Sequence, residues 1–479
     1  MRQDVGHQRT LVVGAIYASK GTETLLDPSR GHDSITKALT HCIKNHPVLS
    51  AVIVNGDTEK PSFDLLETLD LSHHIDTRDF GSDLPEGERI EQLLSVVSDE
   101  QFSLVDEHPP WKVVLASLPT QDGFTTRLLV LFAYYHSHGD GKSGLAFHRA
   151  FLQGLQDGAT SDQANELSSR RLLPPMEEAG KLSLSWSYLL SPLLGVYLPS
   201  FLATMLGFRA SAVAQENGIW CGKDLSFDAE NFRTGLAVLT IDHTTMQNAL
   251  QRCKARQTSF TGLLNQLIAR SLHAELGPEH AAKAFASQIV IDLRRLFQGA
   301  FSDESMMNCV SAYNETISSA PIVDEDWTSP TSDVWTAARN TTAELAKCAG
   351  SLHNQPIGLL QYLKEFRPWT LGQIGKKREG SYEISNLVVF DPAVRPAEGS
   401  KASAEAIQIE RTIFAQPANA AGACLNFNLV TTKNGPLVMT VTWQQGVLDL
   451  GDEAQEARFV RKVCSRIETN IRELAAAPL

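Results

Sequence analysis

The chain has 479 residues, and its 42 Lys and Arg against 55 Asp and Glu give a formal net charge of −13. With 43% hydrophobic and 20% charged residues it has the composition of a folded globular protein, which excludes a disordered or collagen-like chain. The acidic balance argues against broad binding of nucleic acid, because such binding needs a basic surface that neutralises phosphates. The length predicts two or three domains, and an anionic ligand would have to be met by a local cluster of cations.

The cysteines and the first residues bear on the cellular compartment. The seven cysteines are scattered and include no Cys-x-x-Cys pair, so neither a disulfide framework nor a zinc site is expected. The N-terminus stays polar as far as Leu11 and lacks the apolar run of a secretory signal. We therefore expect a cytoplasmic protein.

Helical and strand-like patterns alternate in the first third of the chain. Apolar residues at helical spacing predict a helix over residues 35–43, which Pro47 ends. Strands are predicted over residues 48–54, 111–118 and 124–135. The last strand is a near-continuous apolar run, which is typical of a strand buried on both faces. It leads directly into the sequence HSHGDG and then into a further helix.

A second set of elements follows a polar stretch at residues 157–171. The predicted elements are strands over residues 236–241, 285–293, 382–390 and 407–414, helices over residues 244–256, 260–276, 334–349 and 454–474, and a hairpin of strands 425–430 and 437–443. Both halves thus combine helices with strands, which predicts an α/β fold of two comparable lobes, each a mixed sheet covered by helices. We assign residues 1–175 to an N-terminal lobe, 176–222 to an apolar crossover segment and 223–479 to a C-terminal lobe.

Residues 182–208 contain no charged side chain and are bracketed by Lys181 and Arg209. The stretch is long enough to span a bilayer, but it contains Pro192 and Pro199 and has no partner segment. Three interpretations stay open: a membrane span, a segment in peripheral contact with lipid, and a pair of protein-packed helices that line an apolar cavity.

The residues that most strongly suggest chemistry are His136, Asp140 and Gly141, directly after the buried strand. The end of a strand that feeds a helix holds side chains rigidly at a cleft. A neutral histidine there can take the proton of a hydroxyl or amine that attacks an acyl carbon, an effect worth roughly 10²- to 10⁴-fold in rate. Each residue also has a structural explanation: a hydrogen-bonded core histidine, a helix cap and a tight turn, respectively.

Three other motifs compete for the same residues. Gly141-Lys142-Ser143 looks like the tail of a P-loop, but His136 occupies the position of the required upstream glycine. The chain has no Gly-x-Ser-x-Gly elbow, which lowers the expectation of a serine hydrolase. His136-x-His138-x-Asp140 resembles the first part of the metallo-β-lactamase motif, although that family has a further histidine where Gly141 stands. A metallohydrolase that uses these three residues as zinc ligands is therefore kept as an alternative.

The motif His136-x-x-x-Asp140-Gly141 resembles that of the acyltransferase superfamily built on two chloramphenicol-acetyltransferase-like lobes. This superfamily includes fungal alcohol acetyltransferases, plant BAHD acyltransferases and peptide-synthetase condensation domains. Further similar segments are HPVL at 46–49, TSFTGLLNQLIARSL at 258–272, IVIDLRR at 289–295, YEISNL at 382–387 and GPLVMTVTWQQG at 435–446. The plant Asp-Phe-Gly-Trp-Gly block is absent, and Tyr135 stands where condensation domains usually have a second histidine. A stand-alone enzyme close to the fungal branch fits these departures.

The resemblance implies a pseudo-dimer of two lobes with the active site in a tunnel between them. It implies that His136 is the general base, that transfer is direct without a covalent enzyme intermediate, and that Asp140 is structural and pairs with Arg294. The co-substrate would be an acyl-CoA, with acetyl-CoA expected first, and no cofactor or metal would be permanently bound. The fungal branch and the uncharged stretch at residues 182–208 together favour an acceptor hydroxyl on an apolar small molecule such as a terpenoid or polyketide. The enzyme is expected to be a monomer.

Two further readings of the function stay open. One is N-acylation or condensation-type formation of an amide or ester, and the other is a ligand-binding protein of the same fold without catalysis.

Secondary candidates complete the predicted site. Asn386 and Gln416 are candidates to donate hydrogen bonds to the developing oxyanion or the thioester carbonyl. Lys376, Lys377 and Arg378 form the one compact basic run of this acidic chain and are candidates to meet the phosphates of coenzyme A. Turn or ladder hydrogen bonds for the first two and a solvated loop for the other three are the structural alternatives.

Overall fold

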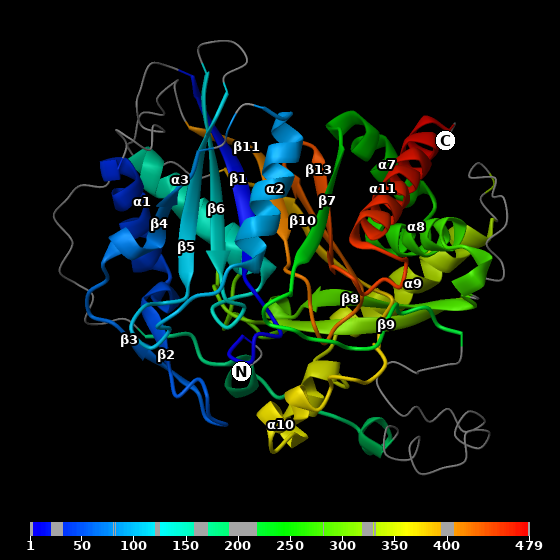
Figure 1. Cartoon of the computed structure of the whole chain (residues 1–479), viewed down its shortest axis with the longest axis horizontal. Helices are drawn as coiled ribbons and strands as arrows, with labels where there is room; N and C mark the ends of the chain where they lie inside the picture. Colours follow the sequence, from blue (N-terminus) through cyan, green and yellow to red (C-terminus); the bar gives the residue numbers. More distant parts are fainter. Residues whose placement is uncertain are drawn as a thin grey trace.

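The computed structural model describes residues 3–20, 32–79, 81, 83–119, 125–157, 171–190, 218–280, 282–318, 329, 332–393 and 407–477. Two large sheets with helices against them occupy neighbouring halves of the molecule (Figure 1). The predicted α/β architecture with two sheet-containing lobes is confirmed.

The first sheet is built mostly from the N-terminal part of the chain. Across the sheet its strands are β11 (Gln408–Ala415), β1 (Leu11–Lys20), β6 (Thr125–Tyr134), β5 (Trp111–Leu118) and β4 (Ile75–Thr77). Helices α1 (His32–Asn45) and α3 (Gly141–Asp157) pack on the face that carries Val13 and Phe132, and α2 (Glu86–Asp99) packs on the face that carries Val12 and Leu131. Because helices cover both faces, β6 is apolar along nearly its whole length.

The second sheet is covered by helices on one face. Across the sheet its strands are β7 (Thr234–Ile241), β13 (Leu437–Gln444), β12 (Leu425–Thr432), β10 (Tyr382–Phe390), β8 (Ala284–Asp292) and β9 (Val310–Ser318). The covering helices are α7 (His243–Ala255), α8 (Phe260–Glu275), α9 (Asp333–Ala349) and α11 (Glu453–Ala476).

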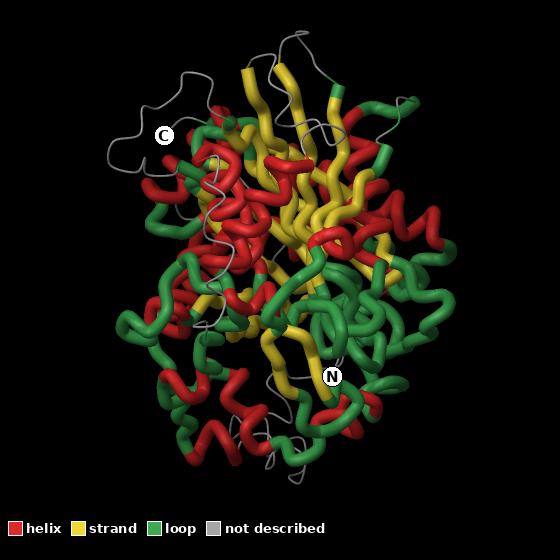
Figure 2. The backbone as a smooth tube through the Cα atoms, turned by 90° about the vertical axis from the view of Figure 1, so that its left-hand side faces the viewer, coloured by secondary structure: helices red, strands yellow, loops and turns green. Residues whose placement is uncertain are grey.

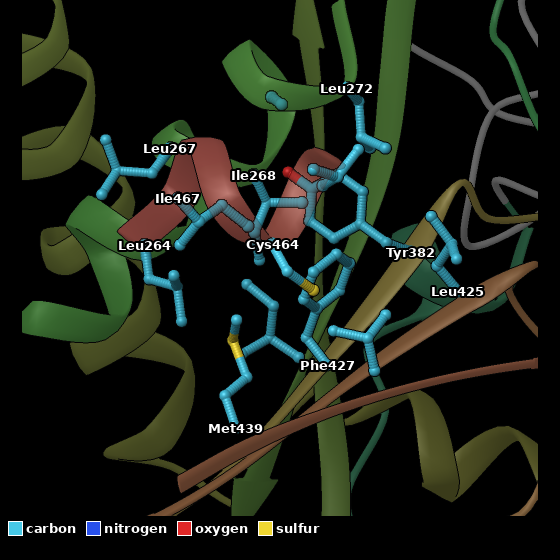
Figure 3. Packing of buried hydrophobic residues seen from close by; sticks show 14 of the residues in the cluster. Leu264, Leu267, Ile268, Leu272, Tyr382, Leu425, Phe427, Met439, Cys464 and Ile467 are labelled. Atoms are coloured by element: carbon cyan, nitrogen blue, oxygen red, sulfur yellow. The ribbon is translucent and has the colours of Figure 1, made fainter. Parts of the chain in front are cut away.

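Side chains of α8 and α11 pack against the strands of this sheet (Figure 3). Leu267 and Ile268 of α8 and Ile467 of α11 belong to the same buried cluster as Phe427 of β12 and Met439 of β13. In β12 the residues between the apolar ones, Asn426 and Asn428, are buried without belonging to this cluster. Their side chains lie on the other face of the sheet because strand residues alternate between faces.

Two elements join the lobes. Strand β11 lies within the range assigned to the C-terminal lobe, yet it pairs antiparallel with β1 in the first sheet, with Val12 opposite Ala415. On its other side, Thr412 and Phe414 of β11 bond to Thr432 of β12 and Thr440 of β13. Helix α2 packs between β1 and β7, so that the two sheets share one core. Strand β11 thus belongs to the C-terminal lobe by sequence and to the first sheet by pairing. The lobe boundaries drawn from the sequence stay a prediction.

Shorter elements lie between the main strands and helices along the chain, and Figure 2 shows loops, short helices and a short pair of strands in the lower part of the molecule. They are η2 (Pro47–Ser50), β2 (Ala51–Val54), β3 (Ser62–Leu65), η3 (Leu71–His74), α4 (Met176–Ala179), η5 (Pro278–His280), η6 (Arg294–Leu296), η7 (Pro356–Tyr362) and α10 (Phe366–Leu371). The strand predicted over residues 48–54 is wrong in its first half, because the chain forms a 3₁₀ turn after Pro47 before β2 begins. Strands β1 and β9 are not among the predicted elements.

The uncharged stretch at residues 182–208 falls mainly outside the described residues, which include only 182–190 of it. There, Trp186 is 79% exposed, while Leu182 is buried against Leu293 and Phe297. Within the part of the chain that the structure describes, none of the helices has the length and apolarity needed to cross a bilayer. Peripheral contact with lipid through this stretch stays a prediction, as does the monomeric state.

We predict that Leu267→Ala lowers the free energy of unfolding by about 2–5 kcal/mol, because it removes a fully buried side chain from the core of the second sheet. Leu250→Ala on α7 is the matched control, since Leu250 is 41% exposed, and it should cost less than about 1 kcal/mol. Urea unfolding followed by circular dichroism measures both. Equal losses would contradict the packing described for α8.

Candidate active site

His136 lies in the turn that connects β6 to α3. Strand β6 ends at Tyr134, the His138 N–H donates to the Tyr135 carbonyl at 2.9 Å, and α3 begins at Gly141. The buried Tyr134 hydroxyl donates to the Asp140 carbonyl at 2.7 Å and so ties the end of the turn back to the strand. The His136 side chain itself is partly exposed and lines two cavities.

Asp140 and Arg294 form a buried, bidentate ion pair between the two lobes. Both Asp140 carboxylate oxygens accept from the Arg294 guanidinium at 2.8 Å, and the two residues are 2% and 1% exposed. The carboxylate also accepts from the backbone N–H of Ser143 at 3.2 Å and of Cys309 at 3.1 Å. A buried charge needs partners of this kind because desolvation alone would be costly.

Arg294 is held in place by further oxygen atoms. Its guanidinium donates to the Met307 carbonyl at 2.9 Å, to the Ser305 carbonyl at 3.1 Å and to Asp292 at 2.9 Å. Burial by itself lowers the pKa of Arg294, but the adjacent Asp140 and Asp292 outweigh it, so the pKa is raised above its ordinary value. Burial by itself raises the pKa of Asp292, but Arg294 and Lys142 outweigh it, so that pKa is lowered. Arg294 is therefore a permanent cation at the base of the site.

Gly141 is required where the two sheets approach the motif. A Cβ atom at this position would lie 2.7 Å from Leu387 Cδ2 and 2.9 Å from Phe414 Cζ. Real Cβ atoms do not come so close to neighbours, so any larger residue would displace α3 from β10 and β11. The glycine of the motif thus sets the distance between the first turn of α3 and the second lobe.

Two cavities meet at His136. The larger has a volume of about 860 Å³ and the smaller about 390 Å³, and both are lined by Gln8, His136, Val310 and Ile357. Apolar side chains dominate the larger cavity, including those of Val48, Phe63, Leu173, Met176, Met306 and Phe366. Polar side chains are frequent in the smaller one, including those of Lys142, Gln288, Glu383, Asn386, Gln416 and Asn419. The histidine is therefore accessible from two chemically different sides.

Asn386 and Gln416 both line the smaller cavity, but their side-chain donors differ in availability. The Gln416 amide donates to Glu383 at 2.8 Å and to Asn428 at 3.0 Å, which uses both of its N–H groups. The Asn386 amide donates to Thr261 at 3.0 Å, and among the described residues its second N–H has no recorded acceptor. Of the two, Asn386 is better able to bind a developing negative charge.

The basic run at 376–378 is divided between surface and interior. Lys376 is exposed and Lys377 half-buried, whereas Arg378 is 1% exposed. The Arg378 guanidinium donates to the carbonyls of Asn419 and Gly422 at 3.2 Å and to Gln444 at 3.0 Å. Arg378 therefore holds the turn behind Asn419 and is not placed to meet a ligand from solvent. Lys376 and Lys377 stay candidates for a phosphate contact.

His138 and Asp140 are not arranged as metal ligands. The ring nitrogens of His138 bond to the Ala51 carbonyl at 2.8 Å and to the Ser137 hydroxyl at 3.1 Å, and the Asp140 carboxylate is engaged by Arg294. Among the described residues, no group of three His, Cys, Asp or Glu side chains is placed to hold a metal ion. The geometry thus gives no support to the zinc hydrolase alternative.

Residues 305–309 of the second lobe also belong to the site and were not predicted from the sequence. The Met307 N–H donates to the Ser143 hydroxyl, and the Cys309 N–H donates to the Asp140 carboxylate. The side chain of Asn308 donates to the His136 carbonyl and lines the larger cavity. Only the tertiary fold brings this segment to the motif, so no local pattern signals it.

The two sheets, their connection and the cavities at the turn after β6 define a known class of fold. The structure is similar to that of TRI3 trichothecene 15-O-acetyltransferase from Fusarium sporotrichioides, with a TM-score of 0.66 and 11% identity over 96% of this chain and 91% of that one. It is also similar to the first condensation domain of the calcium-dependent antibiotic synthetase, with a TM-score of 0.59 and 14% identity over 100% and 94% of the two chains. The fold is that of the chloramphenicol-acetyltransferase-like and condensation-domain proteins.

Sequence comparison identifies the family within this class. The family model described as Alcohol acetyltransferase matches residues 83–470, and the chain belongs to that family. It is 22% identical over 432 residues to the probable alcohol acetyltransferase crmB of Aspergillus fumigatus, covering 85% of each chain. It is 22% identical over 428 residues to the probable alcohol acetyltransferase FCK4 of Fusarium pseudograminearum, covering 87% of this chain and 82% of that one. The protein is an acyltransferase.

We predict that Arg294→Ala lowers the free energy of unfolding by about 3–5 kcal/mol, because it leaves the Asp140 carboxylate buried without its cation. Arg295→Ala is the matched control: the Arg295 side chain is 81% exposed, and its loss should cost less than about 1 kcal/mol. Denaturant unfolding measures the free energy of unfolding of both variants. Similar values for both would show that the buried pair does not stabilise the fold.

The buried histidines predict a loss of stability at mildly acidic pH. Burial lowers the pKa of His46, His74, His138 and His148 to about 4. An unfolded histidine has a pKa near 6.5, so below that pH the unfolded chain binds more protons and the free energy of unfolding falls as the pH falls towards 4.

A histidine of this kind contributes up to about 2 kcal/mol of loss between pH 7 and pH 5. His148→Gln should reduce the pH dependence by that amount, whatever its effect at pH 7, because glutamine does not titrate. Urea unfolding at a series of pH values measures the change, and an unchanged slope for His148→Gln would contradict the prediction.

Proposed function

We propose that this acyltransferase moves an acyl group, acetyl first among them, from an acyl-CoA to a hydroxyl of an apolar small molecule, with His136 as the general base. The observation that carries the proposal is the position of His136 at the junction of two cavities, in a turn that the Asp140–Arg294 pair fixes from below. A base at such a junction can act on a nucleophile from one side and an acyl donor from the other.

The proposed reaction needs one base and no covalent enzyme intermediate. The neutral imidazole of His136 takes the proton of the acceptor hydroxyl as its oxygen attacks the thioester carbonyl carbon. The tetrahedral intermediate then collapses, the carbon–sulfur bond breaks, and the departing sulfur takes the proton from the imidazolium. This base is worth roughly 10²- to 10⁴-fold in rate. The second N–H of Asn386, which does not donate to Thr261, is the candidate donor to the developing oxyanion.

The two cavities suggest where each substrate binds. The larger cavity suits an apolar acceptor, because Phe63, Leu173 and Met306 are among its many apolar lining residues. The smaller cavity, in which polar side chains are more frequent, then receives the thioester end of the acyl-CoA. The names of the relatives agree with a hydroxyl acceptor, since one is named a trichothecene 15-O-acetyltransferase and two are named probable alcohol acetyltransferases.

We predict that His136→Ala reduces transfer by 10²-fold or more while the protein stays folded, because the acceptor loses its base. The assay measures thiol release from acetyl-, malonyl- and longer acyl-CoA with a panel of apolar alcohols, and mass spectrometry identifies the ester. Circular dichroism controls for folding.

His138→Gln separates this proposal from a zinc hydrolase. His138 is buried with its ring bonded to Ala51 and Ser137, so its replacement should affect activity much less than that of His136. Equal loss of activity in the two variants, together with stoichiometric zinc by elemental analysis, would overturn the proposal in favour of the hydrolase.

A further inference from the structure

The ring of His136 is oriented through its main chain. In the described part of the chain, no residue forms a recorded hydrogen bond with the ring nitrogens of His136. The direction of the imidazole therefore depends on its own rotamer and on the backbone dihedrals of the turn. A contact that fixes this backbone has a direct effect on where the ring points in the cavities.

One side chain of the second lobe makes such a contact. The Asn308 amide donates to the carbonyl oxygen of His136, across 172 positions of sequence. Within the described residues this is the one recorded hydrogen bond to the His136 main chain. This hydrogen bond fixes the plane of the peptide that follows His136. Because that plane is joined to Cα through the ψ rotation of His136, the bond restrains ψ and with it the direction of the Cβ atom.

The segment that carries Asn308 is itself held by the buried ion pair. Arg294 donates to the carbonyls of Ser305 and Met307, and the Asp140 carboxylate accepts from the Cys309 N–H at 3.1 Å. The residues on each side of Asn308 are therefore anchored to the same pair that anchors the motif. The Asp140–Arg294 pair and Asn308 are therefore connected, and both contact the turn that carries His136.

We propose that Asn308 is a positioning residue that fixes the main chain of His136 and thereby aims its imidazole at the acceptor hydroxyl. The proposal rests on the proposed function for its kinetic consequence, but the positioning itself is a structural property. The Asp140–Arg294 pair then has a second role, because it anchors the residues on each side of Asn308 and so keeps the Asn308 amide within hydrogen-bond distance of the His136 carbonyl.

Two variants test the role. Asn308→Ala removes the amide, and Asn308→Asp keeps its shape while replacing the donor by a carboxylate that repels the carbonyl oxygen. Asn45→Asp makes the same chemical change at the end of α1, where the Asn45 amide also donates to a main-chain carbonyl, that of His41 at 2.9 Å, and is the matched control. At saturating concentrations of both substrates, kcat should fall by about 10- to 100-fold in both Asn308 variants, because a misdirected base slows only the chemical step.

The kinetic pattern separates positioning from substrate binding. KM for both substrates should stay within about twofold of the wild type, since Asn308 acts through His136. In Asn308→Asp the acid limb of the kcat–pH profile should also move to higher pH, because the new carboxylate favours the protonated imidazole. A raised KM with unchanged kcat would overturn the proposal and make Asn308 a substrate contact.

The orientation of the His136 ring can also be observed directly, without measuring catalytic activity. Crystal structures of wild type and Asn308→Ala should show one orientation of the His136 ring in the first and several in the second. The same single orientation in both would overturn the proposal, even if activity falls. If the wild type transfers no acyl group to any alcohol, the proposed function fails, while the ring orientations still decide whether Asn308 positions His136.

Discussion

The buried ion pair between Asp140 and Arg294 is the constraint on which the site depends. It joins the residue before α3 in one lobe to the first residue of η6, just after β8, in the other, with two hydrogen bonds of 2.8 Å and nearly complete exclusion of water. Replacing such a pair by apolar residues would often cost a fold little, whereas breaking it is costly. Its value here is geometric, because the same two side chains also hold Ser143 and residues 305–309 against the turn of His136.

Pairing and packing connect the two lobes. Strand β11 pairs with β1 and also bonds to β12 and β13, and α2 shares a core with β7. Cavities that meet at His136 are lined from both lobes, by Gln8 on one side and by Val310 on the other. A net charge of −13 disfavours a polyanionic partner but is compatible with a single anionic co-substrate that meets local cations.

The sequence predicted those parts of the fold whose pattern is local. Strand β5 begins and ends where alternation and apolarity place it, and α8 begins after Ser259, whose hydroxyl caps the Gly262 N–H. Strand β1 is not among the predicted elements, although its apolar run is of the kind that predicts β6. Gly14 interrupts this run, and in the structure a side chain at that position would collide with Leu131. The region after Pro47 was misassigned because a proline permits a 3₁₀ turn as well as a strand.

The site was predictable only where a motif marks it. His136, Asp140 and Gly141 stand together in sequence, and the resemblance added Arg294. The contacts of Asn308 and the burial of Arg378 depend on segments far apart in the chain, which no local pattern reports. Gln416 was recognised as a polar residue at the cleft, but its engagement with Glu383 and Asn428 became evident only from the fold.

Direct transfer at a junction of two cavities is the central claim, and the order of chemical events tests it most directly. The measurement is initial velocity with acetyl-CoA and an accepted alcohol both varied, together with the intact mass of the enzyme after incubation with acetyl-CoA alone. Direct transfer predicts intersecting reciprocal plots and an unmodified enzyme mass. Parallel plots and an enzyme that carries a covalent acetyl group would contradict it.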